Sequence, residues 1–359
     1  MKGAGRAQAT GREIFTRLLP FITGFFVFVE LLSLRIGLLD RFFFDTLHAD
    51  TQGIDYYCLP KAWLNLRRGH SMYGTFDPPT YGPHFTWYLA HPLLVVLGWP
   101  LSQLDPAVSY GVFTMCSLGV MACGAAFLAR ESSYALHRRI IWLIMLGAFP
   151  SFSMLYVGNV QSITVLGVVL LFVGMLRVAR GAYGSSRFIL VGLLISLFTK
   201  PVVVLLLPLL LLLRETRRPV CQALAVYLPV SLAFEFSPTL NPESIGLMRV
   251  LWLVSHPAFV RSAMNIYVNH LQLTPDMRDN SIHWLNLVAQ SGFRLKHIDV
   301  FSLSAFLDTL TGVRTPDWLY TLPPLAVLVL SVILSRIRSA GLRREAALLL
   351  AIGGLLSFF

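Results

Sequence analysis

The stretch VSYGVFTMCSLGVMACGAAFL, residues 108–128, contains no charged side chain. A helix that crosses a hydrocarbon core about 30 Å thick needs about 20 mainly apolar residues, and this stretch has that length. Further apolar runs of similar character lie at residues 18–39, 140–156, 162–178, 220–236, 319–334 and 346–359. The pattern predicts a membrane-spanning helix at each of these places.

The composition of the chain agrees with this prediction. Hydrophobic residues make up 55% and charged residues 13% of the 359 residues, and the mean hydropathy is +0.66. These values exceed the apolar share of ordinary globular domains. We therefore expect an all-α, polytopic integral membrane protein in which residues 1–359 form a single membrane domain.

One apolar stretch, residues 188–213, is interrupted in its middle by Thr199, Lys200 and Pro201. Each half has about a dozen residues, which is too short to cross the hydrocarbon core unaided. We expect a pair of short helices here, with the break toward the outer side of the membrane.

The first apolar run contains two charged residues near its expected outer end, Glu30 and Arg35. Ionisable side chains inside a membrane usually pair with one another. We expect these two to stabilise each other.

The formal net charge of +11 could indicate a nucleic-acid partner, but the distribution of the charge argues against one. Lys and Arg lie in small clusters between the apolar runs, as they do in cytoplasmic loops. The clusters occupy residues 2–17, 130–139, 177–187, 214–218 and 336–344. We expect the amino terminus and these clusters to be cytoplasmic in a multi-pass protein of the cell membrane.

This orientation places two large segments on the extracytoplasmic side, residues 40–106 and 237–318. Within the first segment, residues 83–101 have no crossing to make if both flanking basic clusters are inside. Their prolines and histidines are tolerated at a membrane interface. We expect an interfacial or re-entrant helix, and an ordinary membrane span is the alternative.

The sequence gives no indication of a cofactor. The four cysteines form no CxxC pair, so neither a disulfide framework nor a zinc site is indicated. No spacing of histidines and carboxylates suggests another metal. The short inner loops contain no Walker loop, and no GxGxxG follows a strand, so a nucleotide has no place to bind. Any donor substrate must arrive through the lipid or from outside.

The first outer segment contains aspartates at five-residue intervals, Asp40, Asp45, Asp50 and Asp55. This spacing advances about 140° around a helix, so the four cannot share one helical face. Asp55 opens an amphipathic run with apolar residues at helical spacing through Leu66, and a helix amino terminus can hold a carboxylate. Asp55 is therefore the candidate catalytic residue. A simple N-cap next to the membrane is the alternative.

Several short motifs occur in order along the chain. An outer-loop aspartate is followed by an aromatic and small-residue helix and a Tyr/Pro run, formed by Asp55, Tyr56, Ala62, Gly69, Tyr73, Pro78, Pro79, Tyr81 and Pro83. GNVQS, at residues 158–162, lies at the start of an apolar run. FTKP, at residues 198–201, breaks another, and DNSIHWLNL, at residues 279–287, lies in the second outer segment.

Taken together, these motifs resemble those of glycosyltransferase family 87, the polyprenyl-phosphate-sugar-dependent membrane enzymes of the GT-C type. GNVQS resembles the family's Gly-Gln-x-Asn element with the amides transposed, and FTKP resembles its Lys-Pro break. DNSIHWLNL resembles an Asn-Gln-Ser motif from which the Gln is missing. The chain stops at Phe359 inside an apolar run, where family members usually continue, so we expect a carboxy terminus that is truncated relative to the family.

The resemblance implies a GT-C helical bundle with about 8–10 membrane helices. It also implies an enzyme that transfers a sugar, with mannose the expected one, from a polyprenyl-phosphate donor to an extracytoplasmic lipid or glycan acceptor. Asp55 would be the general base, with Asp50 and Asp45 as fallbacks. The donor phosphate would be held by Lys200, Arg68 and His84. The substrate-binding residues would be Tyr56, Tyr81, Asn159, Gln161, Asn280 and Ser281.

Each role has a structural alternative. Lys200 could snorkel to the interface. Arg68 and His84 could contact lipid headgroups. Asn159 and Gln161 could cap backbone groups at a helix end.

Two rival functions remain open. A transporter or flippase for a polyprenyl-linked lipid would share the basic groove but need no catalytic carboxylate. A non-catalytic membrane subunit of an envelope-glycan assembly complex would bind no donor at all.

Overall fold

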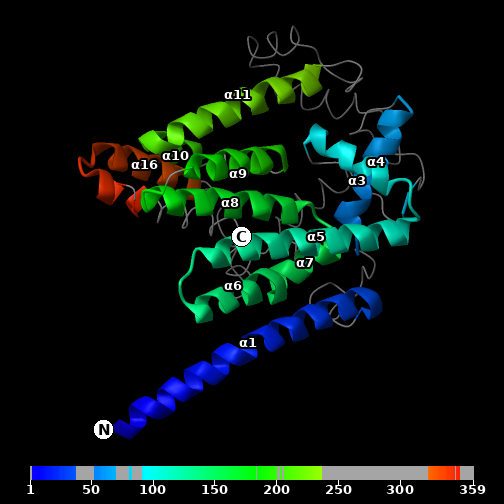
Figure 1. The fold of residues 1–359 in the computed structure, drawn as a ribbon. Helices are drawn as coiled ribbons and strands as arrows, with labels where there is room; N and C mark the ends of the chain where they lie inside the picture. The colour runs from blue at the N-terminus through cyan, green and yellow to red at the C-terminus, as the bar shows by residue number, and fades with distance from the viewer. Residues whose placement is uncertain are drawn as a thin grey trace, which may run out of the picture.

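The structure, a computed structural model, describes residues 2–37, 52–69, 81–82, 91–182, 184–199, 203, 206–236, 322–343 and 345–347. These residues form helices joined by turns, with no β-strand among them. The helices, labelled as in Figure 1, are α1 (Lys2–Ile36), α3 (Ile54–Arg67), the 3-10 turn η2 (Pro92–Leu94), α4 (Val95–Leu101), α5 (Pro106–Arg130), α6 (Ala135–Gly147), α7 (Phe149–Val157), α8 (Gln161–Ala179), α9 (Ser185–Thr199), α10 (Leu207–Leu212), α11 (Arg214–Phe236) and α16 (Leu322–Arg336). The predicted all-α character is confirmed for this part of the chain.

Four segments are long and apolar enough to cross a membrane: Glu13–Ile36, Pro106–Arg130, Ala135–Val157 and Gln161–Ala179. They coincide with the first four apolar runs of the sequence. Run 220–236 lies in α11, and the described part of run 319–334 lies in α16, but neither helix is among these four segments. Run 346–359 lies almost wholly outside the described residues. The helices found are thus compatible with a multi-pass membrane protein.

One predicted span consists of two helices. Run 140–156 is divided between α6 and α7 by Ala148, whose backbone is extended at φ −93° and ψ 150°. Pro150 stands in the first turn of α7. Because proline has no N–H and its ring clashes with the carbonyl four residues earlier, an unbroken helix is disfavoured here. The two helices together still provide the length of one crossing.

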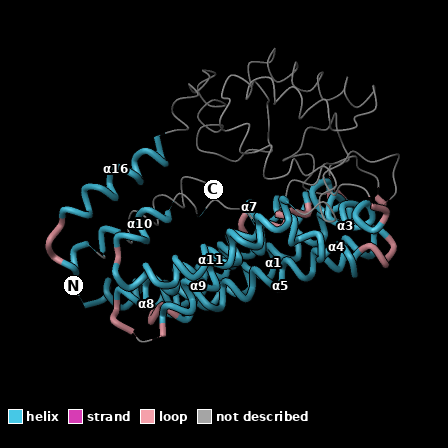
Figure 2. Tube along the Cα trace, turned by 90° about the horizontal axis from the view of Figure 1, so that it is seen from above, coloured by secondary structure: helices cyan, strands magenta, loops and turns pink. Residues whose placement is uncertain are grey.

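The ends of the helices gather at two opposite ends of the bundle. Figures 1 and 2 both show α3 and α4 at one end and α10 and α16 at the other. Hydrogen bonds join the starts of α5 and α8 to the α3 end. At the opposite end Arg177 and Arg180, near the end of α8, form ion pairs with Glu131 at the end of α5.

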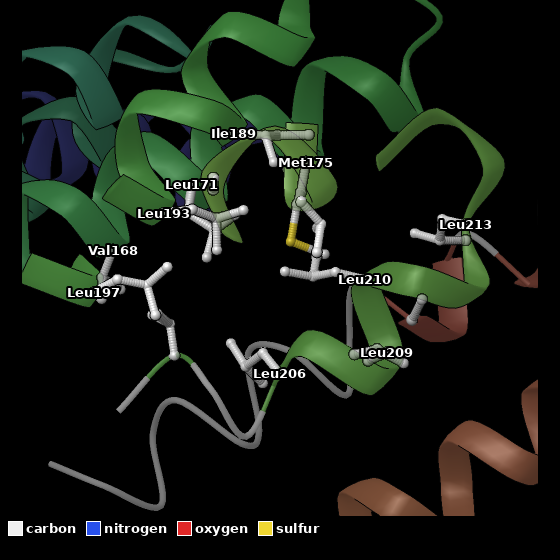
Figure 3. Packing of buried hydrophobic residues seen from close by; sticks show 14 of the residues in the cluster. Val168, Leu171, Met175, Ile189, Leu193, Leu197, Leu206, Leu209, Leu210 and Leu213 are labelled. Carbon is white, nitrogen blue, oxygen red and sulfur yellow. The ribbon is translucent and has the colours of Figure 1, made fainter. Parts of the chain in front are cut away.

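The largest hydrophobic cluster is built by α8, α9 and α10. Figure 3 shows the side chains of Leu171, Ile189 and Leu193 close together in it. The backbones of α8 and α9 approach closely at Gly192, where an added Cβ would overlap the backbone of Leu171 and Gly167. Small residues allow such close helix contacts, which supply the dispersion attraction that holds helices together in lipid.

The interrupted stretch 188–213 forms helices of unequal length. The first half is the helix α9, which ends at Thr199, but α10 has only six residues. Two short helices are therefore present on either side of the break, as predicted, and residues 200–202, 204 and 205 between them lie outside the described part of the chain. Leu206 and Leu209 are both buried in the large cluster, which shows that this short helix is held by packing rather than by its own length.

The expected pairing of Glu30 with Arg35 is not seen in the structure. Glu30 is turned into the protein, with 4% of its surface exposed and its Oε2 atom without a hydrogen-bond partner. Arg35 is exposed. Five residues advance about 140° around a helix, so the two side chains leave α1 on different faces.

Residues 83–101 were predicted to form an interfacial or re-entrant helix. Residues 83–90 lie outside the described part of the chain. The remainder is the turn η2 and the seven-residue helix α4, which is far too short to cross a membrane. Helix α4 instead lies against α3, and an added Cβ at Gly98 would overlap the carbonyl oxygen of Leu59.

Candidate functional site

The structure brings together two residues that the sequence singled out separately. Asp55 lies in the first turn of α3, and Asn159 lies in the turn between α7 and α8. The Nδ2 atom of Asn159 donates a hydrogen bond of 2.7 Å to Oδ2 of Asp55, across a separation of 104 residues. The candidate catalytic carboxylate is therefore in contact with one of the candidate substrate-binding amides.

The orientation of the Asn159 amide is fixed by its own backbone surroundings. Its Oδ1 accepts a hydrogen bond of 2.9 Å from the backbone N–H of Gln161, the first residue of α8. Its backbone N–H donates to the carbonyl of Met154 at 3.0 Å. Because Oδ1 faces an N–H donor, Nδ2 is the atom that faces Asp55. Asn159 thus satisfies a backbone group at the helix start, as the structural alternative predicted, and also holds the carboxylate.

Two glycines let the chain segments at this site approach each other. Gly158 has φ +70°, and an added Cβ would overlap Cβ of Tyr56. Gly53 has φ +74° and donates its backbone N–H to the carbonyl of Tyr156 at 2.7 Å. Positive φ values are readily available only to glycine. The turn after α7 is therefore fastened against the start of α3 by backbone contacts.

A cluster of buried aromatic side chains packs beside the site. It contains Tyr56, Tyr57, Tyr81, Tyr110 and Phe113. The hydroxyl of Tyr110 donates to the carbonyls of Leu155 and Tyr156, at 2.7 and 2.8 Å, and so joins the start of α5 to the end of α7. Buried hydroxyl groups need such partners, because leaving one unsatisfied is costly. The cluster positions α3, α5 and α7 relative to one another.

The predicted substrate contacts Tyr56 and Tyr81 both belong to this cluster. Tyr56 is fully buried, and its hydroxyl is hydrogen-bonded to the hydroxyl of Ser109. Burial raises the pKa of Tyr56 above that of an ordinary phenol, so the hydroxyl stays protonated at neutral pH. The Tyr81 hydroxyl is bonded to the carbonyls of Leu101 and Leu104. In this structure both side chains support the site through protein groups.

One polar stripe on α3 was not expected from the sequence. Cys58, Lys61 and Asn65 lie at neighbouring positions of the helix, three and four residues apart, and Lys61 and Asn65 are 2% and 6% exposed. Burial raises the pKa of the Cys58 thiol to about 12, with the charge of Asp55 raising it further and that of Lys61 opposing the rise. Burial also lowers the pKa of Lys61. The three- and four-residue spacing of Cys58, Lys61 and Asn65 could have revealed this stripe, but the sequence analysis followed the apolar residues on another face of the same run.

Two of the remaining predicted residues are described. Arg68 is exposed at the carboxyl end of α3, and Gln161 begins α8. Asp45, Asp50, His84, Lys200, Asn280 and Ser281 lie outside the described residues. The position next to Lys200 is described: Thr199, at the end of α9, accepts a hydrogen bond of 2.8 Å from the hydroxyl of Thr164 on α8.

His91, one of the histidines in residues 83–101, packs between two helices. Its Nε2 is 3.0 Å from the hydroxyl of Ser231 on α11, and its ring contacts Phe198 on α9 and Tyr227 on α11. Burial lowers the pKa of His91, which favours the neutral imidazole at neutral pH. A neutral ring between two helices fits a structural role better than that of a phosphate cation.

The arrangement can perform proton transfer but offers no obvious metal site. Within the residues that the structure describes, no group of three or more His, Cys, Asp or Glu side chains could hold a metal ion. An aspartate held by an amide is a suitable proton acceptor.

Comparisons of the chain with protein-family models, with curated proteins and with solved structures found no match.

Proposed function

We propose that this protein is a membrane glycosyltransferase of the GT-C type, resembling family 87. It would transfer a sugar, with mannose the expected one, from a polyprenyl-phosphate donor to a lipid or glycan acceptor on the extracytoplasmic side. The observation that carries the proposal is the hydrogen bond between Asp55 and Asn159. Two motifs on which the resemblance rests, far apart in the sequence, meet at one place.

Asp55 is the general base of the proposed reaction. Its carboxylate accepts the proton of the attacking acceptor hydroxyl. The hydroxyl oxygen forms a bond to the anomeric carbon, and the bond between that carbon and the phosphate oxygen breaks. The polyprenyl phosphate leaves with the electron pair. The leaving group is already a good one, so no general acid is needed.

Asn159 keeps the base in position. The amide is itself held by the backbone of α8 and the end of α7, so the Asp55 carboxylate has a fixed partner on one side. Catalytic groups need to be held within a fraction of an ångström of the productive geometry. A neutral amide can do this without cancelling the negative charge that a base requires.

The distribution of arginines supports the proposed orientation. Arg177 and Arg180 lie at the end of the bundle opposite Asp55, and so does Arg139, which donates to the Thr16 carbonyl near the middle of α1. Basic residues concentrate on the cytoplasmic side of membrane proteins. The site would then face the extracytoplasmic side, where polyprenyl-phosphate sugars are available to enzymes of this type.

The test is sugar transfer in membranes that contain wild-type protein, Asp55→Asn or Asp105→Asn. The donor is radiolabelled polyprenyl-phosphate-mannose, and the acceptors are total lipid and glycan. Asp55→Asn should lower the transfer rate by about 10²- to 10⁴-fold, the usual value of a general base. Asp105→Asn is the matched control: Asp105 caps α5 by accepting from the N–H of Ala107, and asparagine caps a helix equally well.

The other outcomes assign the function elsewhere. Equal transfer by wild type and Asp55→Asn would remove Asp55 from the role of base and move it to Asp50 or Asp45. Movement of the labelled lipid across the membrane, without transfer and without sensitivity to Asp55→Asn, would favour a transporter. Failure of the wild-type protein to bind any polyprenyl-phosphate lipid would favour a non-catalytic subunit.

A further inference from the structure

Glu30 is a buried acid for which neither the resemblance nor the candidate site provides a role. It lies in the segment Glu13–Ile36, which is long and apolar enough to cross a membrane. Only 4% of its surface is exposed, and its Oε2 atom has no hydrogen-bond partner. Ionisable side chains at such positions are costly and mark sites for ions, protons or substrates. This carboxyl group therefore requires an explanation.

The side of α1 that carries Glu30 packs against other helices. Val27 and Leu34, three residues before and four residues after Glu30, both pack against one buried cluster. That cluster includes Leu146 of α6 and Leu155 of α7. Residues at these spacings are neighbours on one helix face. The Glu30 carboxyl group thus points into the protein, toward α6 and α7.

Along the length of α1, Glu30 is level with the break between α6 and α7. Arg139 of α6 donates to the carbonyl of Thr16. Further along both helices, an added Cβ at Gly147 would lie 2.9 Å from Cβ of Phe26. The first pair is 123 residues apart and the second nearly the same, so α1 and α6 run parallel. The same offset places Glu30 just beyond Gly147, where α6 ends and α7 begins.

The break leaves carbonyl groups at the end of α6 without their helical donors. In a continuous helix the carbonyl of Leu146 would accept from residue 150, but this residue is a proline and has no N–H. The carbonyl of Gly147 would accept from Ser151, whose N–H donates instead to the carbonyl of Ala148 at 2.8 Å. The end of a helix also carries partial negative charge. The break is therefore a region of oxygen acceptors.

We propose that the Glu30 carboxylate and the carboxyl-terminal end of α6 form a binding site for one monovalent cation, Na⁺. The groups assigned to it are the carboxylate oxygens and the carbonyls of Leu146 and Gly147, all of which can only accept. Hard cations prefer oxygen ligands of this kind. Interrupted helices of membrane proteins supply such carbonyl groups to Na⁺. The inference goes beyond the proposed function and does not depend on it.

The charge balance selects a monovalent ion. Residues 106–129 and 140–157, which form the facing parts of α5, α6 and α7, contain no charged side chain. Arg35, the counter-charge expected from the sequence, is exposed. One Na⁺ makes the site neutral together with Glu30. A divalent ion would leave an excess positive charge away from water, which is costly.

A cation at this place would also act on the candidate functional site. It would join α1 to the break and so fix the position of α7. The end of α7 contacts the candidate site directly, because Gly53 donates to the carbonyl of Tyr156 and the N–H of Asn159 donates to the carbonyl of Met154. The ion would thus stabilise the turn that carries Asn159.

The experiment measures the Tm of the purified protein in detergent, in NaCl and in choline chloride at equal ionic strength. Wild type is compared with Glu30→Gln, which removes the charge and keeps the size of the side chain. The matched control is Glu13→Gln, which removes an exposed carboxylate from the same helix. No lipid-linked sugar is present, so the result is independent of the proposed transfer activity.

Na⁺ at ten times its Kd is expected to raise the Tm of wild type by about 2–5 °C relative to choline. Glu13→Gln should keep this shift, and Glu30→Gln should lose it. Equal shifts in wild type and Glu30→Gln would overturn the site. Absence of a shift in wild type would also overturn it, and a Glu30→Gln variant as stable as wild type would then assign a proton to the carboxyl group.

A measurement on the wild-type protein covers the case in which Glu30→Gln does not fold. Dicyclohexylcarbodiimide, an apolar reagent that modifies protonated carboxyl groups, is applied in the two salts, and the modified residues are mapped by mass spectrometry. Na⁺ at ten times its Kd should slow the modification of Glu30 about tenfold, because it displaces the proton that the reaction requires. The rate at the exposed Glu13 is the internal reference and should not change. Equal rates at Glu30 in the two salts would overturn the assignment.

Discussion

The two ends of α8 carry carboxylate contacts of different kinds. At its start, the neutral amide of Asn159 donates a hydrogen bond to Asp55, next to the cluster of buried tyrosines. At its end, Arg177 and Arg180 form ion pairs of 2.7 and 3.0 Å with Glu131, and Arg180 has a side chain that is 55% exposed. Both contacts join segments that are distant in the sequence, and both fix the position of α8.

The difference lies in what happens to the charge of the carboxylate. The two arginines more than balance the charge of Glu131, so this contact joins the ends of α5 and α8 through neutralised charge. The Asn159 amide positions Asp55 without supplying a positive charge. The first arrangement stabilises the fold, whereas the second keeps a carboxylate that can accept a proton.

The largest expected contrast between the two ends is in thiol reactivity. Burial raises the pKa of Cys58 from 9.0 to about 12, which lowers its thiolate fraction at pH 8 by about a thousandfold. Cys58 should therefore react with N-ethylmaleimide about a thousandfold more slowly than an ordinary thiol. The reference is a cysteine introduced by Ser133→Cys in the exposed loop between α5 and α6, with Cys116, Cys123 and Cys221 replaced by serine throughout. Similar rates at both positions would show that the candidate site is open to water.

A second comparison uses two glycines with positive φ, Gly158 after the end of α7 and Gly181 after the end of α8. Gly158→Ala should lower the free energy of unfolding by about 2–4 kcal/mol, because strain at φ +70° is added to overlap with Tyr56. Gly181→Ala, at φ +73° after α8, meets no atom within 4 Å and should cost only about 1 kcal/mol. Thermal unfolding in detergent measures both. Equal losses would mean that the turn after α7 is not pressed against α3.

Removal of the positioning amide should affect turnover more than stability. Asn159→Ala is expected to lower kcat for sugar transfer about 10- to 100-fold with little change in donor binding, because Asp55 loses the donor that orients it. Asn159→Asp should be worse, since it sets two carboxylates against each other. Ser162→Ala, one turn away, serves as a control for general damage at the start of α8. A loss of donor affinity instead of kcat would assign Asn159 to substrate binding.

The smallest effects are expected at the arginine end. Arg180→Ala should change the free energy of unfolding by less than about 1 kcal/mol, because exposed ion pairs are screened by water and salt. Arg177→Ala should cost more, since Arg177 also lies 4.4 Å above the Phe188 ring. Unfolding at low and high salt separates the two contributions. Transfer activity should be retained in both variants, and a loss would connect this end to the reaction.

The sequence predicted the long helices well, because the thickness of a bilayer sets the length of an apolar run. It also placed Asp55 at the start of a helix, through the amphipathic run that follows. The division of α6 from α7 was missed although Pro150 lies in the run. Hydropathy measures the polarity of side chains and not whether a residue has a backbone N–H for the helix hydrogen bonds, which proline lacks. The pair of short helices around Thr199, Lys200 and Pro201 was predicted, because Pro201 and a charged residue interrupt the apolar run.

The site itself was predictable only in part. The order of motifs brought Asp55 and Asn159 into one hypothesis, but no local pattern states that an amide will face a carboxylate 104 residues away. The burial of Lys61 depends on what covers one side of α3, which the linear pattern does not show. Likewise, glycine is required at position 158 because a larger residue would overlap Tyr56, and this is a tertiary contact that the sequence does not reveal.

The contact between Asp55 and Asn159 also has a consequence for the order in which the protein is made. Asp55 leaves the ribosome early in synthesis, but the Asn159 amide that contacts it is made only after α5, α6 and α7. Until then, the growing chain has no Asn159 amide to contact the Asp55 carboxylate. Assembly of the candidate site is therefore tied to the synthesis of the turn before α8, so a nascent chain released before that turn lacks the contact between Asp55 and Asn159.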